Sequence, residues 1–412
     1  MIIGTWNIRG ICSPQKQRAV HAWANKHMLD IFCVLETKLF SQENVSKCFG
    51  FFKNKGFSYD DQMNPSFLGR ILVFWKSAIN ATIIDAFEQG VLCNFKDDIH
   101  NLFVGFIYGS NDPLRRKHLW RKLVEWSEWC HDANFTILGD FNEILCSGDR
   151  SSSLSIPRTA LDFQNCVNLM DMHEVNSVGP HFTWTNKNSL GKLIASKLDR
   201  CLINPCWLAS FCNTFVLVDM PGISDHCSLV LHLRHANTSR PKPFKFFNAW
   251  TSHNLFLQTV EDCWQMSIDG SPMFILFQKQ KKLKGLLRKF DKIHFSHLPN
   301  SIKTLKGELN AVQNEMMHGS LNEDNAERER NLLHQLDMME HDYNHMLHQK
   351  SRLDWIHYGD ASTKFFHCMI RGRKAKNSIN AVINSNGNVL YSQEQVRAEF
   401  IDYFKNLIGT TI

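Results

Sequence analysis

The segment from Leu138 to Glu143, LGDFNE, carries the residues best suited to chemistry. Asp140 and Asn142 follow the apolar run FTIL, which predicts that both lie at the carboxyl end of a strand, with their side chains pointing the same way. A carboxylate there can act as a general base or a metal ligand, and an amide can orient water or stabilise a developing negative charge. Asp and Asn after a strand also commonly form a simple turn, so this segment alone leaves both interpretations open.

Other polar residues also emerge at the ends of apolar runs. A carboxylate at a strand end needs a partner or a cation, and neighbouring Asp and His side chains offer an oxygen ligand and a switchable donor to phosphate. Taken singly, each residue has an ordinary structural explanation, such as a turn cap or a core imidazole. Together they favour a hydrolytic metal site. These residues are Asn7, Glu36, Tyr108, Asp199, Ser224, Asp225 and His226.

Short apolar or alternating runs between polar turns predict that the first 235 residues form an α/β or α+β domain with substantial sheets. The expected strands are Ile2 to Ile8, Ile31 to Leu35, Ile71 to Trp75, Leu102 to Tyr108, Phe135 to Leu138 and Ser228 to Leu233. The expected helices are Pro14 to Leu29, Pro113 to His131 and Pro157 to Met170, each with proline near its start.

The strand pattern stops at the polar, proline-bearing segment His235 to Pro243, which predicts a domain boundary. Helical periodicity follows over Phe274 to Phe295, Ser301 to Met317 and Ala326 to Leu353. We expect these helices to form a spacer whose Met and Leu stripe packs against itself.

Composition sets weaker bounds. The 412 residues allow two domains, and the net charge of +6 favours polyanionic partners only slightly. Thirteen cysteines without a C-x-x-C pair, and no secretory signal, favour a nuclear or cytoplasmic protein that is not secreted. We expect no membrane association, because no apolar run approaches the length of a span. The spacing of Cys201, Cys206, Cys212 and His226 argues against a zinc site.

In chain order, TWNIRG, LETK, IYG, GDFN, FTWTN, KLDR and SDH resemble the motif series of the endonuclease/exonuclease/phosphatase superfamily. More narrowly, GRILVFWK and FTWTN followed by KLDRCLIN resemble the apurinic-type endonuclease domain of plant non-LTR (LINE-type) retrotransposon polyproteins. The resemblance implies a four-layer α/β/β/α sandwich of the DNase-like type, followed by an all-α helical region.

PFKFFNAW, DWIHYGDASTKFFH and RGRKAKNSI resemble the connector that precedes the reverse transcriptase in those polyproteins. The resemblance implies an endonuclease domain over residues 1–235, a linker over 236–252, a helical connector over 253–355, and over 356–412 the start of a reverse-transcriptase-associated region. We expect the chain to be truncated before the polymerase core, because no strand-borne Asp-Asp pair follows Asn384. We therefore expect no polymerase activity.

The resemblance also implies a role for each site residue. Glu36 would bind Mg²⁺, with Mn²⁺ as the alternative ion, Asn7 beside it and Asp225 as a further ligand. Asp140 would be the general base and Asn142 its orienting or anion-stabilising neighbour. His226 would donate to the scissile phosphate, and Tyr108 would contact the same phosphate. Asp199 would hold His226, and Thr183 and Ser224 would occupy supporting polar positions.

The resemblance implies an endonuclease that nicks DNA to prime reverse transcription, with DNA as its partner and retroelement RNA as a further candidate. One alternative is a phosphatase or phosphodiesterase of the same superfamily acting on a small phosphoester. The other is a catalytically silent retroelement remnant whose helical half binds nucleic acid or a partner. The basic residues for such binding are Arg371, Arg373, Lys374 and Lys376, although such clusters are more often merely solvated surface.

Overall fold

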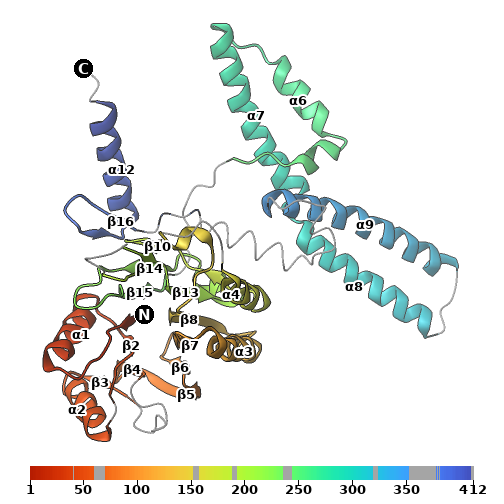
Figure 1. The fold of residues 1–412 in the computed structure, drawn as a ribbon. Coiled ribbons are helices and arrows are strands. Elements are labelled where there is room, and N and C mark those ends of the chain that lie inside the picture. Colours follow the sequence, from red (N-terminus) through yellow and green to blue (C-terminus); the bar gives the residue numbers. More distant parts are fainter. Residues whose placement is uncertain are drawn as a thin grey trace. The chain divides into compact units, whose positions relative to one another are not determined.

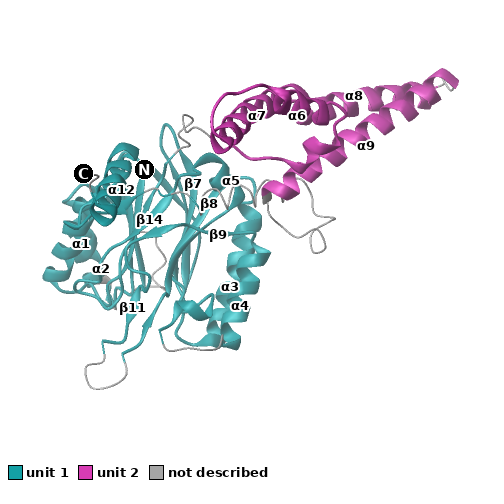
Figure 2. Cartoon of the chain, turned by 90° about the horizontal axis from the view of Figure 1, so that it is seen from above, with its two compact units in different colours: residues 1–238, 371–412 teal, residues 239–370 magenta. Residues whose placement is uncertain are grey.

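The computed structural model describes residues 1–39, 41–59, 70–151, 157–187, 193–234, 244–318, 323–351, 377, 379 and 381–409. The chain divides into two compact units, residues 1–238 with 371–412, and residues 239–370 (Figure 2). We call the first the sandwich unit and the second the helical unit. Within the described residues, no helix combines the length and apolar character needed to cross a membrane.

The sandwich unit contains two large mixed sheets (Figure 1). The first has the order β10-β14-β15-β1-β2-β4-β3. Its strands are β1 (Ile2–Asn7), β2 (Ile31–Leu35), β3 (Phe57–Ser58), β4 (Ile71–Lys76), β10 (Ser177–Val178), β14 (Phe215–Val218) and β15 (Leu229–His232). The second has the order β5-β6-β7-β8-β13-β9. Its strands are β5 (Asn80–Phe87), β6 (Gly90–Lys96), β7 (Asn101–Tyr108), β8 (Asn134–Asp140), β9 (His173–Glu174) and β13 (Asp199–Ile203).

The two sheets pack face to face over a continuous apolar core. Alternate residues of the central strands enter it, among them Ile3 and Cys33 from the first sheet and Phe106 and Leu138 from the second. The opposite residues of each strand face helices. The outer face of the first sheet packs on α1 (Pro14–Lys26) and α2 (Gln42–Lys53), and that of the second on α3 (Pro113–Trp129) and α4 (Arg158–Leu169). The expected four-layer α/β/β/α sandwich is confirmed.

Local sequence explains where the flanking helices begin. Ser13 and Asp112 cap α1 and α3 by accepting hydrogen bonds from the backbone of the first turn, and a proline follows each cap. Shorter elements complete the fold between β8 and β15. They are η2 (Ser147–Asp149), α5 (Pro205–Ser210), and the hairpin of β11 (Trp184–Thr185) and β12 (Ala195–Ser196).

The C-terminal elements belong to the sandwich unit. They are β16 (Val382–Ile383), β17 (Val389–Leu390) and α12 (Gln393–Ile408). Tyr391 packs against the rings of Phe215 and His232, and its carbonyl accepts a hydrogen bond from Arg234 at 3.1 Å. This attachment joins the C-terminal segment to β14 and β15, which are far away in sequence.

The helical unit contains η3 (Asn248–Ser252), α6 (Phe256–Gln265), α7 (Pro272–His294), α8 (Leu298–Met317) and α9 (Glu323–Ser351). The long helices expected from the periodicity are present, with α8 and α9 paired over a small core that contains Leu309, Val312 and Leu332. Part of the stretch expected to be a linker is packed, because Trp250 of η3 is only 2% exposed in a second core with Phe290.

Candidate active site

Strand register brings three polar residues of the second sheet into one row. Tyr108 of β7 lies opposite Asp140 of β8 in a parallel pair, and Asp199 of β13 lies opposite Asp140 in an antiparallel pair. These residues share the face of Phe106, Leu138 and the other residues of the inter-sheet core, because side chains on one strand face the same way at every second position. The row therefore lies at the end of that core, facing the first sheet.

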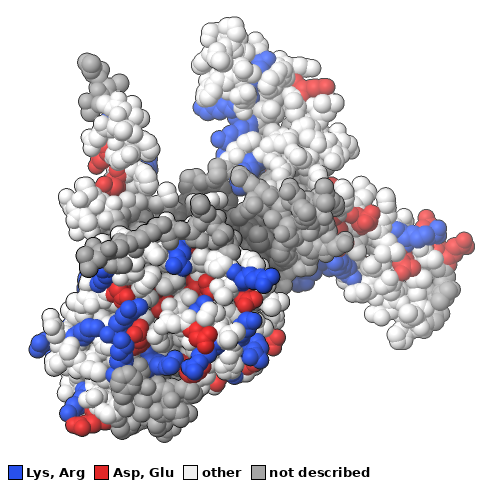
Figure 3. Space-filling model, viewed as in Figure 1, with Lys and Arg blue, Asp and Glu red and all other residues white. Residues whose placement is uncertain are grey.

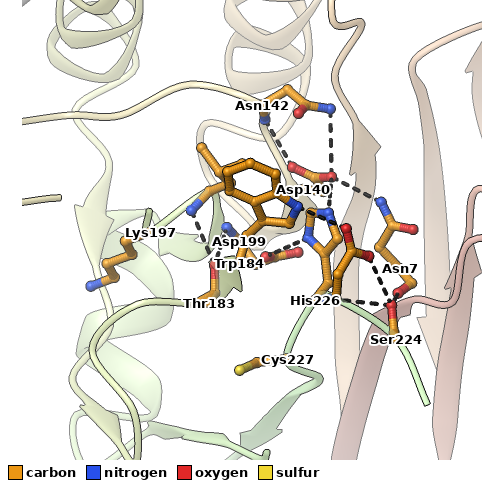
Figure 4. Close-up of polar contacts among 12 residues, drawn as sticks. Asn7, Asp140, Asn142, Thr183, Trp184, Lys197, Asp199, Ser224, His226 and Cys227 are labelled. Atoms are coloured by element: carbon orange, nitrogen blue, oxygen red, sulfur yellow. Dashed lines mark hydrogen bonds and ion pairs between the residues drawn. The ribbon is translucent and has the colours of Figure 1, made fainter. Parts of the chain in front are cut away.

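Asp140 is fully buried and receives hydrogen bonds from both sheets (Figure 4). Asn7, at the end of β1, donates from Nδ2 to Asp140 Oδ2 at 2.9 Å. The backbone N–H of Asn142 donates to Asp140 Oδ1 at 2.9 Å. Donors on both oxygens fix the orientation of the carboxylate and offset part of the cost of its burial.

Asn142 lies beside Asp140, as expected, but for a different reason. Strand β8 ends at Asp140, and Asn142 adopts a left-handed backbone conformation with φ of 50°, so a turn and not strand alternation brings the two residues together. Its Nδ2 donates to the carbonyl of Gly109 at 2.8 Å. This close approach requires a glycine, since a Cβ at Gly109 would lie 2.5 Å from the carbonyl oxygen of Phe141.

His226 lies between two carboxylates. Its Nδ1 is 3.0 Å from Asp199 Oδ2, and its Nε2 is 3.7 Å from Asp140 Oδ2. Thr183 holds Asp199 in place, because the Thr183 Oγ1 accepts a hydrogen bond from the backbone N–H of Asp199 at 2.9 Å. Among the residues that the structure describes, Asp140, Asp199 and His226 form a buried group whose ligand-type atoms lie within 4.8 Å of one another.

The charges in this group shift its ionisation. Burial raises the pKa of Asp140 to about 6, although the neighbouring His226 opposes the rise. Burial alone would lower the pKa of His226, but the charges of Asp199 and Asp140 outweigh it and raise this pKa to about 9. Near neutral pH the site therefore contains a deprotonated Asp140 beside a protonated imidazole, which supplies a base and an acid together.

The segment before β15, which contains Ser224 and Asp225, holds His226 in position. Ser224 donates from Oγ to the carbonyl of Asn7 at 2.6 Å and accepts the N–H of His226 at 3.2 Å, which joins this segment to β1. The neighbouring Asp225 contacts a different element, because its Oδ2 accepts a hydrogen bond from the indole N–H of Trp184 in β11 at 2.9 Å. Trp184 stands in the quoted segment FTWTN but was not among the predicted site residues.

Glu36 and Asp225 lie beside the buried group and are more exposed, with 17% and 13% of their side chains accessible. Glu36 accepts a hydrogen bond from the Tyr108 hydroxyl, and burial together with the charges of Glu36 and Asp140 raises the pKa of Tyr108 well above its usual range. The Nε of Arg9 is 3.6 Å from Glu36, and its Nη1 is 2.9 Å from Asp225. Lys38 Nζ lies 3.1 Å from Glu36.

These donors fit a hard divalent cation. Mg²⁺ prefers oxygen ligands, usually one or two carboxylates together with water molecules, and the partly exposed carboxylates of Glu36 and Asp225 offer such a set. The His226 group fits less well, because both imidazole nitrogens face carboxylates and a protonated imidazole has no lone pair to offer. The Asn7 amide is also engaged, with its Nδ2 on Asp140 and its Oδ1 on the N–H of Arg9 at 3.2 Å.

Backbone strain is concentrated around these residues. Left-handed backbone is uncommon outside glycine, and its accumulation at one place is typical of functional sites. Of the seven non-glycine residues with positive φ in the described parts of the chain, five belong to the site or contact it. They are Arg9, Glu36, Lys38, Asn142 and Lys187.

Arg200 supports the site from the other face of β13. Its guanidinium is almost fully buried and contacts Asp149 Oδ2 at 2.5 Å and Glu174 Oε1 at 2.9 Å. Strand alternation places Asp199 toward His226 and Arg200 away from it. Arg200 was not among the predicted site residues, because the spacing of KLDR contains no signal for its distant partners.

The structure thus brings together Asn7, Glu36, Tyr108, Asp140, Asn142, Thr183, Asp199, Ser224, Asp225 and His226. The basic residues Arg371, Arg373, Lys374 and Lys376 lie outside the described residues. Cys201, considered for zinc, is buried beside Thr136, whose hydroxyl lies 3.4 Å from its sulfur.

Several solved structures resemble this chain. The endonuclease domain of TRAS1, a telomere-specific non-LTR retrotransposon, matches 57% of this chain and 98% of its own, with 12% identity and a TM-score of 0.44. The AP endonuclease LMAP from Leishmania major matches 57% and 88%, with 17% identity and a TM-score of 0.46. An AP endonuclease from Archaeoglobus fulgidus matches 57% and 99%, with 16% identity and a TM-score of 0.43.

The family follows from the sequence match. A model of the Endonuclease/Exonuclease/phosphatase family matches residues 4–226, a stretch that covers more than half of the chain and contains every site residue described above. The chain belongs to the endonuclease/exonuclease/phosphatase family.

Proposed function

We propose that this protein is a Mg²⁺-dependent endonuclease that nicks DNA. The observation that carries the proposal is the buried pair of Asp140 and His226, a base and an acid on one site, beside the accessible oxygens of Glu36 and Asp225. Phosphodiester hydrolysis needs these parts: a base for water, a donor to the phosphate and a site for a cation.

Each side chain has a task in this mechanism. Asp140 accepts a proton from the attacking water, and Asn7 and Asn142 hold its carboxylate in place. His226 donates from Nε2 to a phosphate oxygen while Asp199 keeps the imidazole protonated and oriented. Tyr108 contacts the same phosphate. Glu36 and Asp225 would hold Mg²⁺, with Mn²⁺ as the alternative. When bound, such an ion neutralises charge on the phosphate and the leaving oxygen.

A polyanionic substrate suits the surroundings of the site. The basic side chains of Arg9, Lys16 and Lys38 lie near its acidic residues, and Lys187 donates to the carbonyl of Ser224 at 2.5 Å. Lys and Arg side chains also lie among acidic ones over the visible face of the sandwich unit (Figure 3). Basic groups around an acidic centre can hold the flanking phosphates of a nucleic-acid backbone while one phosphate reaches the site.

The retrotransposon-like motifs in both parts of the chain extend the proposal to a biological role, which is to open a DNA strand so that its 3′ end primes reverse transcription. Retroelement RNA would then be a further partner. A phosphatase of the same family would use the same site chemistry, so the endonuclease and the phosphatase are distinguished only by which substrate the protein cleaves.

The direct test incubates purified full-length protein with supercoiled plasmid and Mg²⁺, with and without a chelator. We expect nicked circles that require the metal and Asp140, and whose nicks a DNA polymerase can extend. Phosphate release from inositol phosphates without nicking would favour the phosphatase. A protein inactive on both substrates that binds DNA with a steep salt dependence would favour the silent remnant.

A further inference from the structure

The carboxylates that we propose as metal ligands already have a cationic partner. The guanidinium of Arg9 spans both, with Nη1 at 2.9 Å from Asp225 Oδ2 and Nε at 3.6 Å from Glu36 Oε2. Lys38 contacts only Glu36. Arg9 is thus the described side chain that joins the two acids in one ion-pair network.

The backbone of Arg9 is fixed although its side chain is 46% exposed. Its N–H donates to Asn7 Oδ1, and the next two N–H groups donate to the carbonyls of Glu36 and Thr37 at 2.7 and 2.9 Å. Arg9 and Gly10 both have positive φ, at 48° and 98°. The turn therefore anchors the guanidinium beside the site while leaving its side chain free to change partner.

The guanidinium and a metal ion compete for the same oxygen. The ion pair between Arg9 Nη1 and Asp225 Oδ2, at 2.9 Å, leaves no room for a metal ion on the face of that oxygen that Arg9 occupies. An ion there would also repel the guanidinium by charge. A displaced Arg9 stays tethered beside Glu36, which accepts a hydrogen bond from Tyr108, a proposed phosphate contact. The planar guanidinium matches a phosphate well because it can donate two parallel hydrogen bonds.

We propose that Arg9 is a counter-ion that exchanges partners: it neutralises Glu36 and Asp225 in the metal-free protein, and metal binding transfers it to a phosphate of the DNA. Arg9 thereby couples the two binding events. Metal binds more weakly to the free protein than its carboxylates alone would allow, and DNA binds more tightly once the metal is present. This inference rests on the proposed function and names a positioning and substrate-binding residue for it.

The test measures binding without turnover. Mn²⁺ binding to the full-length protein is followed by electron paramagnetic resonance of the free ion. Binding of a labelled DNA duplex is followed by fluorescence anisotropy, with and without Mn²⁺, in an Asp140→Asn background that prevents cleavage. The test variant is Arg9→Gln. Lys38→Gln is the matched control, because it removes one positive charge beside Glu36 without breaking the bridge to Asp225.

We expect Arg9→Gln to strengthen Mn²⁺ binding by about tenfold, because it removes a positive charge and also frees the Asp225 oxygen that Arg9 occupies, and to abolish the Mn²⁺-dependent tightening of DNA binding. Lys38→Gln should change Mn²⁺ binding by much less and keep the tightening. Equal Mn²⁺ affinities for Arg9→Gln and Lys38→Gln, or an unchanged DNA response in Arg9→Gln, would overturn the inference.

The two proposals fail in different ways. Mn²⁺ binding that Glu36→Gln abolishes and Arg9→Gln leaves unaltered rejects the role of Arg9 but keeps the metal site. Mn²⁺ binding that Glu36→Gln does not weaken rejects the metal site itself, and the role of Arg9 with it. Thermal unfolding of each variant confirms that the differences arise in folded protein.

Discussion

The sandwich unit and the helical unit bury different kinds of side chain. Nearly all of the buried polar and charged residues that the structure describes lie in the sandwich unit, and the exception is His348 of α9. Large exposed apolar side chains do not distinguish the units, since Leu169 of the sandwich unit and Met273 of the helical unit are each 75% exposed. Buried polar groups are stable only when their partners are fixed, so the sandwich unit has the rigidity that a catalytic site requires.

The strongest test of this comparison removes the central carboxylate. Asp140→Asn keeps the size of the side chain but removes the base, so we expect the rate of plasmid nicking to fall by roughly a thousandfold or more. Asp132→Asn, which changes an exposed carboxylate of the same unit, should leave the rate unchanged. Similar rates for the two variants would show that the buried acid has no catalytic role.

The pH dependence of nicking tests the same pair more finely. Asp140 must lose its proton and His226 must keep one, so the rate should rise through about pH 6 and fall through about pH 9. Asp199 raises both of these pKa values, so Asp199→Asn should move both limbs to lower pH and lower the maximum. Limbs that stay in place in this variant would contradict the assigned coupling.

Arg200 tests whether rigidity on the outer face of β13 matters for the site. Arg200→Met leaves Asp149 buried without its cation, which costs about 3–5 kcal/mol of unfolding free energy. We expect a lower unfolding temperature and a nicking rate reduced about tenfold in the protein that remains folded, through the displacement of Asp199. Lys47→Met, which breaks the exposed pair with Glu43, should change neither quantity appreciably. A full nicking rate in folded Arg200→Met would limit Arg200 to stability.

The helical unit supplies the smallest expected effect on nicking. Trp250→Ala removes a large side chain from its core and should destabilise this unit by about 3–5 kcal/mol. Limited proteolysis should then cut within residues 244–351 at lower temperature, while the plasmid-nicking rate stays the same. A large loss of nicking would show that catalysis depends on the helical unit.

The sequence predicted the elements and the residue types well, because apolar periodicity and cap residues are local signals. The strand from Ile2 and the helix from Pro14 were expected from these signals and are confirmed, whereas the four-layer arrangement, also confirmed, was expected only from the family resemblance. Strand order was not predictable, because pairings such as β13 with β8 join segments about sixty residues apart.

Contacts between segments far apart in the sequence also account for what was not predicted in the site. Asp140 and Asn142 could be found from a strand followed by polar residues, but their geometry depends on a left-handed turn and on Gly109. The partners of Arg9 and Arg200 come from distant segments, so no spacing in TWNIRG or KLDR indicates them. These ion pairs could be identified only from the three-dimensional structure.

The row of Tyr108, Asp140 and Asp199 has a consequence for how such a protein can change over time. Because the row depends on strand register, inserting or deleting a single residue within β7, β8 or β13 would turn one member to the wrong face, and no neighbouring substitution could restore it. Changes of length in the connections outside these three strands do not shift that register, so such connections can vary between related proteins, or be altered by design, while the row stays in place.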